Sequence, residues 1–373
     1  MTKTAKFAGV AAGVCPADAP AVPASAAAHA TARIEWNEDM PQHSTTVSLD
    51  AYGAARHRAA FAARSDRGLI VVSGADRAAY LQGLLTNDVA SLAAGAGVYA
   101  AYLTPQGRMI TDLFVYELGD VMLVTVARAE TEAVLSRFDQ FLFGEDVKLG
   151  NVTDAFAHVS VVGPHAAEVV AGAIGDSAAR GALDSLAEHG SARLTFRGQP
   201  AIVTRETDAG EPGFGVYIDR TLADAFTSSL RASDVAELDA QTLDALRVEA
   251  GVPWFGRDMD GETIPLEAGI ESRAISFTKG CYVGQEVIIR VLHRGHGKVA
   301  RKLASLVLDG DDVPRAGAAV TSGDREVGSV TSAAWSPRAG HAIALAYLHR
   351  DFLAPGTAVA VEGAAATVVT PPI

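Results

Sequence analysis

Cysteine is scarce in this sequence of 373 residues, which contains only Cys15 and Cys281. Because the two thiols lie far apart in the chain, they do not form the disulfide framework of a small secreted domain, and their scarcity favours a reducing cytoplasm. Two cysteines also fall short of the four thiolates that hold a typical iron–sulfur cluster. We therefore do not expect the chain to hold a conventional cluster alone.

Long apolar runs and positive charge are also in short supply. No run approaches the ~20 residues that a membrane-spanning helix needs, so we expect a soluble protein without a membrane partner. The 31 Lys and Arg stand against 44 Asp and Glu, which gives a net charge of −13. This balance argues against binding of nucleic acid by the whole surface, but it leaves room for a local basic site.

Three regions differ in composition. Residues 1–45 are rich in Ala and Pro and poor in bulky apolar side chains, which predicts a disordered arm. Residues 46–299 alternate strand-like and helix-like segments, which predicts an α+β body of two modules. Residues 300–373 contain short apolar runs separated by Gly, Asp and Pro, a spacing typical of a small β-barrel.

The body repeats one pattern twice. Residues 69–72 are typical of a buried strand, and residues 131–143 have the spacing of a helix. A second strand is predicted over 156–162, and a second helix over 242–250, where Gly251 supplies a stop signal. Mixed strands and helices of this kind indicate sheets with helices packed on one face.

Cys281 is the most informative single residue. Lys279 precedes it by two positions, and a nearby ammonium favours the reactive thiolate over the thiol. Gly280 and Gly284 flank it and would let a ligand approach the backbone. The alternative is that Cys281 is a small buried hydrophobe, which is the commonest role of a free cysteine.

Positive charge is concentrated after Cys281. Glu286 is the only acid between residues 279 and 302. Such a cluster suits an anionic ligand such as a carboxylate or phosphate, although it could equally be a solvated basic face or pair with acids elsewhere. The spacing of Cys281, His293 and His296 matches no common zinc arrangement, so we predict no metal site. The basic residues of this window are Lys279, Arg290, Arg294, Lys298, Arg301 and Lys302.

The stretch Lys-Gly-Cys-Tyr-Val-Gly-Gln-Glu at residues 279–286, here called the cysteine motif, resembles the signature of the YgfZ-type folate-binding proteins. These proteins belong to the glycine cleavage T-protein, or aminomethyltransferase, superfamily. Residues 80–89 are similar to the early helix and turn of the same group. Residues 204–214 and 246–251 resemble the aminomethyltransferase itself. The resemblance implies a T-protein-like α+β fold of mixed sheets and helices around a central channel, followed by a C-terminal β-barrel.

The resemblance also implies tetrahydrofolate, or a one-carbon derivative of it, as the cofactor. By resemblance Glu211 is the candidate for the pterin end, because a carboxylate can accept two N–H donors side by side. Asp112 corresponds to the second of two aspartates in the T-protein, and Thr111 stands in place of the first. Arg247 is a further candidate, with structural ion pairing as its alternative. Tyr282 could stack on a flat heterocycle, with core packing as its alternative.

Three functions remain open on this basis. The first is a tetrahydrofolate-binding accessory protein for iron–sulfur cluster assembly or repair, with Cys281 and Lys279 as chemical groups, Arg294 near the folate, and assembly factors or client proteins as partners. The second is a folate-dependent aminomethyltransferase or related one-carbon transferase. The third is a folate-binding regulator without catalysis. The cysteine motif favours the first function, because the aminomethyltransferase does not use that signature.

Overall fold

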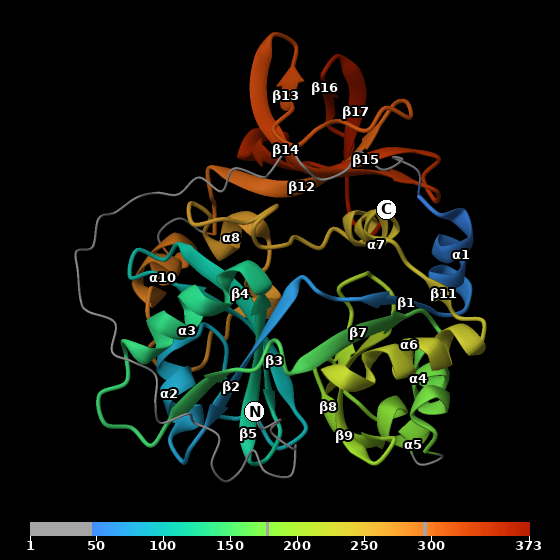
Figure 1. Ribbon diagram of the computed structural model, residues 1–373. Coiled ribbons are helices and arrows are strands. Elements are labelled where there is room, and N and C mark those ends of the chain that lie inside the picture. The colour runs from blue at the N-terminus through green and yellow to red at the C-terminus, as the bar shows by residue number, and fades with distance from the viewer. Residues whose placement is uncertain (1–46, 177–178, 294–296) are drawn as a thin grey trace.

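The computed structural model describes residues 47–373 apart from 177–178 and 294–296. The predicted arm over 1–45, with Cys15, lies outside the described residues. Two open sheets form the body of the molecule, and a closed barrel sits over them (Figure 1).

The first sheet has five strands in the order β3-β4-β5-β2-β6. They are β2 (Arg67–Ser73), β3 (Gly97–Leu103), β4 (Met109–Glu117), β5 (Val121–Ala127) and β6 (Lys148–Asn151). The second sheet has six strands in the order β11-β1-β7-β10-β9-β8. They are β1 (Ala60–Ala63), β7 (Phe156–Val162), β8 (Ser191–Phe196), β9 (Gln199–Glu206), β10 (Gly213–Asp219) and β11 (Ala236–Glu237).

The barrel closes in the order β12-β15-β14-β13-β16-β17. Its strands are β12 (Arg301–Leu308), β13 (Ala319–Ser322), β14 (Arg325–Ser336), β15 (His341–His349), β16 (Ala358–Val361) and β17 (Ala364–Val369). Its interior is filled by aliphatic side chains such as Leu306, Val320 and Leu348, which are all almost fully buried. The barrel that the short apolar runs predict is therefore confirmed.

Helices cover the outer face of each sheet. On the first sheet these are α2 (Arg77–Leu84) and α3 (Thr131–Asp139), and on the second they are α4 (Ala166–Ile174), α5 (Ala179–Asp184) and α6 (Ala223–Ala232). The other helices are α1 (Leu49–His57), α7 (Ala240–Glu249), α8 (Pro265–Ala268), α9 (Glu271–Ala274) and α10 (Gln285–His293). Single 3-10 turns occur at Arg128–Glu130, Arg220–Leu222 and Arg350–Phe352.

The two-residue period of a strand decides which side chains face the helices. On β4, Leu113 and Val115 pack under α2 and α3, whereas Phe114 and Tyr116 point to the other side. On β10, Phe214 packs with α4 and α6, while Tyr217 points to the other side. The side chains that point away from the helices of both sheets share one cluster, so the inner faces of the two sheets lie against each other.

The chain crosses from one sheet to the other very early. β1 pairs with β7 in the second sheet, whereas β2 pairs with β5 in the first. The crossing falls in residues 64–66, and Figure 1 shows it as the blue ribbon that runs between the two halves of the body. The sequence pattern did not indicate β1, because its four residues Ala-Phe-Ala-Ala have little β-propensity.

The helix predicted over 131–143 ends earlier than its apolar spacing suggests. α3 stops at Asp139, and the next turns are closed by hydrogen bonds that span three residues instead of four. The N–H of Phe141 donates to Phe138 O, and that of Leu142 donates to Asp139 O. Bonds of this kind tighten the end of a helix and break its register. Phe141 and Phe143 are consequently exposed, so their apolar character misled the prediction.

α7 lies between the barrel and the body (Figure 1) and carries two fully buried charges, Arg247 and Glu249. Arg247 donates to Asp258 at 2.6 Å and to Ser332 of β14 at 2.8 Å. Its other bonds reach Asp244 Oδ1 and the carbonyl of residue 252. The side chain is therefore held from the helix, from the loop after it and from the barrel at once.

Glu249 reaches different neighbours from Arg247. Its carboxylate accepts hydrogen bonds from the hydroxyls of Tyr52 on α1 and Ser336 on β14, and it forms an ion pair with Arg56 on α1. Each oxygen has protein partners, which is the condition under which a buried carboxylate is tolerated. Glu249 therefore connects α1 and the barrel to the same position on α7.

We expect Glu249→Ala to lower the free energy of unfolding by about 3–5 kcal/mol, because Arg56 loses its most buried counter-ion and two hydroxyls lose their acceptor. Urea unfolding followed by circular dichroism measures the change. The control is Glu286→Ala, because Glu286 is an exposed partner of Arg290 on α10 and should contribute little. Similar losses in the two variants would contradict this account of α7.

Candidate ligand site between the two sheets

Polar side chains occupy alternate positions on the inner faces of the strands. Asp112 lies on β4, His158 and Ser160 on β7, and Thr204 and Glu206 on β9, and all five are buried. The outward positions between them are aliphatic, as in Val159 and Val161. The inner faces thus combine a hydrophobic cluster with ionisable groups, an expensive arrangement that needs specific partners.

Asp112 is only half satisfied by the protein. Its Oδ2 accepts a hydrogen bond of 2.8 Å from the hydroxyl of Tyr99, while its Oδ1 is buried with no partner among the described residues. Burial raises the pKa of Asp112, and the charge of Arg67 and the bond from Tyr99 only partly offset this. Burial also raises the pKa of Tyr99 well above its ordinary value, so its hydroxyl stays a donor.

Glu206 is the centre of a second group on the inner face. His158 Nε2 lies 3.1 Å from its Oε1, and the hydroxyls of Thr204 and Tyr217 lie 3.3 Å from the same oxygen. Ser160 donates to Oε2 at 3.3 Å. Burial alone would raise the pKa of Glu206, but the charge and hydrogen bond of His158 and the charges of two arginines outweigh it and lower the pKa to about 2. Glu206 is therefore a carboxylate at any physiological pH.

The crossing between β1 and β2 supplies the two arginines. Arg64 forms a two-pronged ion pair with Asp66, with both bonds at 2.9 Å. Arg67 donates to Thr125 Oγ1 at 3.2 Å, and its guanidinium lies over the ring of Phe114. The charge of Arg67 acts on the pKa values of both Asp112 and Glu206, so it joins the groups of the two sheets.

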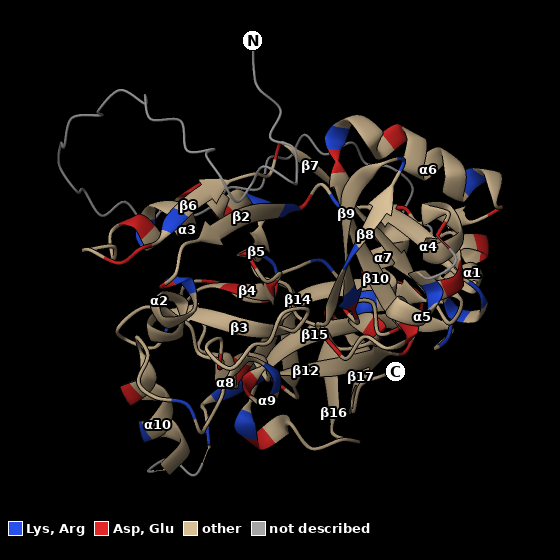
Figure 2. Cartoon of the chain, turned by 90° about the horizontal axis from the view of Figure 1, so that it is seen from below, with Lys and Arg blue, Asp and Glu red and all other residues tan. Residues whose placement is uncertain are grey.

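We call Arg64, Asp66, Arg67, Asp112, His158 and Glu206 the inner charged cluster. In Figure 2, which views the chain from below, charged residues of both signs lie between the two sheets as well as along the outer helices.

Glu211 and Arg247 lie in the network around α7 rather than among these groups. Glu211 accepts a hydrogen bond of 2.5 Å from Arg56, which also pairs with Glu249. Its side chain is 20% exposed, so one edge of the carboxylate reaches solvent. Arg247 is fully buried in the ion pairs described above, the structural alternative that the sequence left open.

The ammonium of Lys279 in the cysteine motif is bound by backbone carbonyls. It donates to three of them, those of Gln82, Leu85 and Asn87, at 2.6–2.9 Å. These carbonyls belong to the last turn of α2 and to the residues just after it, where a cation completes the unpaired end of a helix. Burial lowers the pKa of Lys279 to about 8, and Asp88 partly offsets this. Because only the ammonium has three N–H groups, the three acceptors favour the charged form.

The other residues of the motif divide between surface and core. The thiol of Cys281 is free and exposed. Tyr282 is buried in the cluster between the sheets, with the ammonium of Lys279 over its ring. A side chain at Gly284 would meet the carbonyl oxygen of Thr104 at 2.5 Å, so this glycine allows the motif to pack on the β3–β4 turn.

Three of the basic residues after the motif form ion pairs, one with Glu286 of the motif itself and two with acids from elsewhere in the fold. Arg290 pairs with Glu286 at 2.6 Å, and Lys302 pairs with Glu271 at 2.9 Å. Arg301 lies 3.5 Å from Glu267. Arg294, the remaining predicted contact to folate, lies outside the described residues.

Comparisons with known proteins agree with this arrangement. A family model described as the GCVT N-terminal domain matches residues 25–279, and one described as the glycine cleavage T-protein C-terminal barrel domain matches residues 301–373. The first match alone covers more than half of the chain. The chain belongs to the glycine cleavage T-protein family.

Relatives within this family are named aminomethyltransferases. One from Rubrobacter xylanophilus is 33% identical over 311 residues, which cover 83% of this chain and 81% of the relative. One from Streptomyces avermitilis is 31% identical over 315 residues, which cover 83% of each. The narrower resemblance to YgfZ-type proteins stays a prediction.

A solved structure supports the family's fold. The glycine cleavage system aminomethyltransferase T from Bartonella henselae matches with a TM-score of 0.78 at 23% identity, covering 87% of this chain and 88% of that chain. The α+β body and C-terminal barrel of the T-protein family are therefore confirmed. Within the described part of the chain, no helix is both long and apolar enough to cross a membrane, and no three His, Cys, Asp or Glu gather as metal ligands.

Sequence reasoning missed most of the inner charged cluster. His158 lies in a predicted strand and Glu206 in a segment similar to the family, but the sequence does not single out either side chain. The signal was available, because a polar residue at every second position of an apolar strand marks a face with a special environment. Arg64 and Arg67 gave no such signal, since they flank a crossing that only the sheet pairing reveals.

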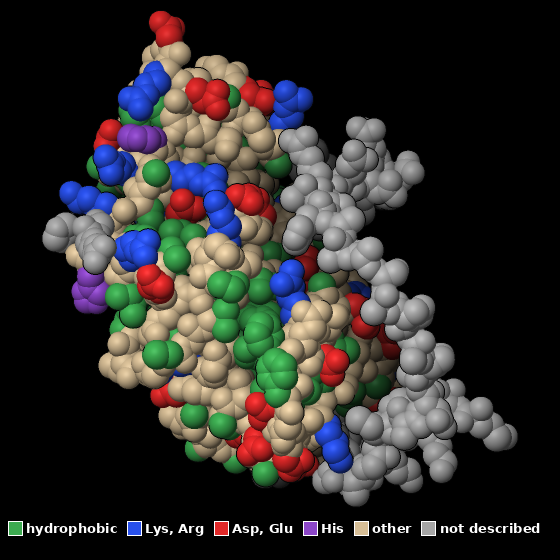
Figure 3. Space-filling view, turned by 90° about the vertical axis from the view of Figure 1, so that its left-hand side faces the viewer, with side chains coloured by type: hydrophobic (Ala, Val, Ile, Leu, Met, Phe, Trp, Pro, Cys, Tyr) green, Lys and Arg blue, Asp and Glu red, His purple; other side chains and the backbone are tan. Residues whose placement is uncertain are grey.

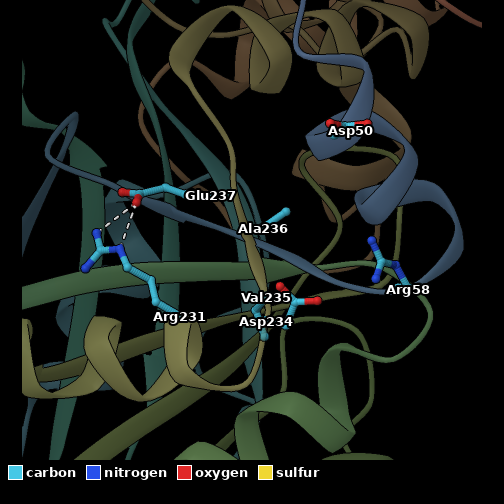
Figure 4. Close-up of a pocket in the computed structure, with 7 residues that line it drawn as sticks. All are labelled: Asp50, Arg58, Arg231, Asp234, Val235, Ala236 and Glu237. Carbon is cyan, nitrogen blue, oxygen red and sulfur yellow. Dashed lines mark hydrogen bonds and ion pairs between the residues drawn. The ribbon is translucent and has the colours of Figure 1, made fainter.

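A separate hollow of about 440 Å³ lies at the edge of the second sheet. Figure 4 shows Arg231 of α6 and Glu237 of β11 pointing toward each other, and they form an ion pair of 2.8 Å. None of the predicted site residues lines this hollow. Its lining residues are Asp50, Arg58, Arg231, Asp234, Val235, Ala236 and Glu237.

The surface near the cysteine motif also exposes apolar side chains. Phe277, just before the motif, is 60% exposed, and Ile289 on α10 is 43% exposed. Figure 3 views the molecule from the side of α10 and shows hydrophobic side chains among basic and acidic ones. Scattered apolar residues of this kind are ordinary on a protein surface and do not by themselves define a site.

We expect Lys279→Met to lower the free energy of unfolding by about 1–3 kcal/mol, because three partly buried carbonyls lose their donor. The matched control is Cys281→Ala, two residues away, which should change little because the thiol is exposed. Thermal and urea unfolding of the two variants measure the difference. A stable Lys279→Met variant would show that the three carbonyls find other donors.

Proposed function

We propose that this chain binds a reduced folate between its two sheets, with Asp112 orienting the ligand. The supporting observation is the buried Oδ1 of Asp112, which has no partner among the described residues although Oδ2 is held by Tyr99. A buried acceptor without a donor is costly, so it favours a ligand that supplies an N–H group. A pterin ring offers several such groups.

The surroundings of Asp112 suit a flat, polar heterocycle. Tyr99 and Phe114 lie with ring centroids 4.9 Å apart on the same face, and Tyr116 and Tyr217 belong to the same cluster. Aromatic faces stack on heterocycles, while carboxylates recognise their N–H edges. Reduced folate, when bound, supplies the amine nitrogens that carry a one-carbon group. Asp112 would hold the ligand, and Arg67 would keep part of the negative charge of Asp112 in place.

The reaction we favour is a folate-dependent aminomethyl or related one-carbon transfer. Relatives named aminomethyltransferases, about as long as this chain, support it. One departure from the family pattern affects the mechanism. Thr111 takes the place of the first of two aspartates, and its hydroxyl donates to the backbone oxygen of Asp112 at 3.0 Å. Asp112 would therefore act as a single carboxylate.

A second candidate is the accessory function in iron–sulfur cluster assembly or repair, for which the exposed thiol of Cys281 is the specific observation. In this proposal the thiol faces client proteins or assembly factors, and Lys279 positions the motif on α2 rather than activating the thiol. The cysteine motif and the narrower YgfZ-type resemblance belong to this candidate. A cytoplasmic location suits both candidates, because an exposed free thiol is maintained in a reducing compartment.

Calorimetry with tetrahydrofolate tests the binding proposal. We expect saturable binding to the wild type and a loss of affinity of about 10–100-fold in Asp112→Asn, because the amide replaces one acceptor oxygen by a donor. Absence of binding to the wild type would remove folate from the proposal.

Glu211→Ala is the informative companion variant. A comparable loss of affinity would place Glu211 at the pterin end, as the family resemblance implies. Unchanged affinity together with lower stability would assign Glu211 to the network of Arg56 and Glu249 alone.

The two candidate functions separate in a cell that lacks this protein. If the accessory function is correct, Cys281→Ala is expected to bind folate and fold normally but fail to restore the activity of iron–sulfur enzymes. If one-carbon transfer is correct, Asp112→Asn is expected to lose release of the transferred one-carbon group, which is measured in extracts. Full restoration of iron–sulfur activity by Cys281→Ala would exclude a chemical role for the thiol.

A further inference from the structure

His158 and Glu206 fill the space above a glycine. A side chain at Gly215 on β10 would lie 2.0 Å from Glu206 Oε1 and 2.7 Å from His158 Nε2. Gly215 has an ordinary backbone conformation, so the backbone itself does not require glycine at this position. The glycine instead leaves room for the side chains of its neighbours. The His158–Glu206 pair therefore occupies the space that a side chain at position 215 would take.

The orientation of the His158 ring is fixed from two sides. Its Nε2 is held by Glu206, and the ring stacks on Tyr217, the residue paired with it on β10, with centroids 4.2 Å apart and planes within 18°. These two contacts hold the ring, and with it the second nitrogen, in one orientation.

The charge of Glu206 determines which nitrogen of His158 carries the proton. A carboxylate only accepts hydrogen bonds, so Nε2 must be the donor at 3.1 Å. In the neutral ring Nδ1 is then the acceptor. This nitrogen is buried, in a side chain that is over nine-tenths buried, and has no partner among the described residues.

We propose that neutral His158 accepts, through Nδ1, a hydrogen bond from an N–H group of the ligand held between the sheets. The inference rests on the proposed folate binding and adds a second recognition point to it. Asp112 on the first sheet and His158 on the second would each accept from the same hydrogen-bond-donating heterocycle. Both are buried acceptor side chains with one unpartnered atom on an inner face.

Around His158, Glu206 on β9 and Asp66 at the crossing have lowered pKa values and are ionised. Tyr217 on β10 stays neutral, because burial raises its pKa well above the ordinary range.

The test compares the tetrahydrofolate affinity of the wild type and of His158 variants by calorimetry at pH ~8. His158→Gln keeps a donor for Glu206 and an acceptor, so its affinity should stay within a few fold of the wild type. His165→Gln, at an exposed histidine before α4, controls for the loss of a histidine elsewhere in the chain.

The outcomes are distinct. A folded His158→Gln variant that binds as weakly as His158→Phe would overturn the proposal. His158→Phe keeps the stacked ring but no acceptor, so it should bind about tenfold more weakly at pH ~8. An unchanged affinity in that variant would also overturn the proposal.

Nitrogen NMR of the histidine rings in the free wild-type protein decides the tautomer without any variant or ligand. A proton on Nε2 and a bare Nδ1 in His158 support the inference, and the opposite tautomer overturns it. If the wild type binds no folate, the proposed function fails together with the ligand contact. The tautomer measurement then reports on the His158–Glu206 pair alone.

Discussion

The removal of two charges from water at α7 is the constraint on which the rest of the architecture depends. Arg247 and Glu249 have no exposed surface, so every polar atom at their ends must be satisfied within the protein. Their partners come from α1, from the loop after α7 and from strand β14 of the barrel. Because no single segment could satisfy both charges, the barrel, the body and the first helix are held at one point.

The inner charged cluster is also buried, but its polar atoms are not all satisfied within the described residues. Around α7 both charges have complete sets of partners, whereas between the sheets Asp112 and His158 each keep one buried atom unsatisfied. Complete networks stabilise a fold, and incomplete ones mark places where a further partner is needed. Trp254 lies between the two regions, with Arg247 at 4.8 Å and Arg64 at 5.3 Å from its ring centroid. The proposed ligand site between the sheets thus lies next to the residues that hold the barrel.

The cysteine motif combines residues that support the fold with one exposed thiol. Lys279 completes the end of α2, Tyr282 fills the core, and Gly284 permits contact with the β3–β4 turn. Cys281 has none of these duties and is exposed. A local pattern of Lys and Cys suggests an activated thiol, but the ammonium instead donates to three backbone carbonyls. The thiol is therefore free for a partner, while its neighbours fix where it is presented.

The sequence by itself determined most of the strands, several of the helices and the barrel, because two-residue and helical periods are local properties that turn signals delimit. It also pointed to Asp112, to the cysteine motif and to the family. Only the tertiary structure decided which residues far apart in the sequence contact each other. Lys279 meets Asn87, which is 192 residues away, and Glu249 meets Tyr52, which is 197 residues away. Such contacts depend on how sheets and helices pack, and His158 and Glu206 form a pair only because β7, β10 and β9 lie side by side with Gly215 between them.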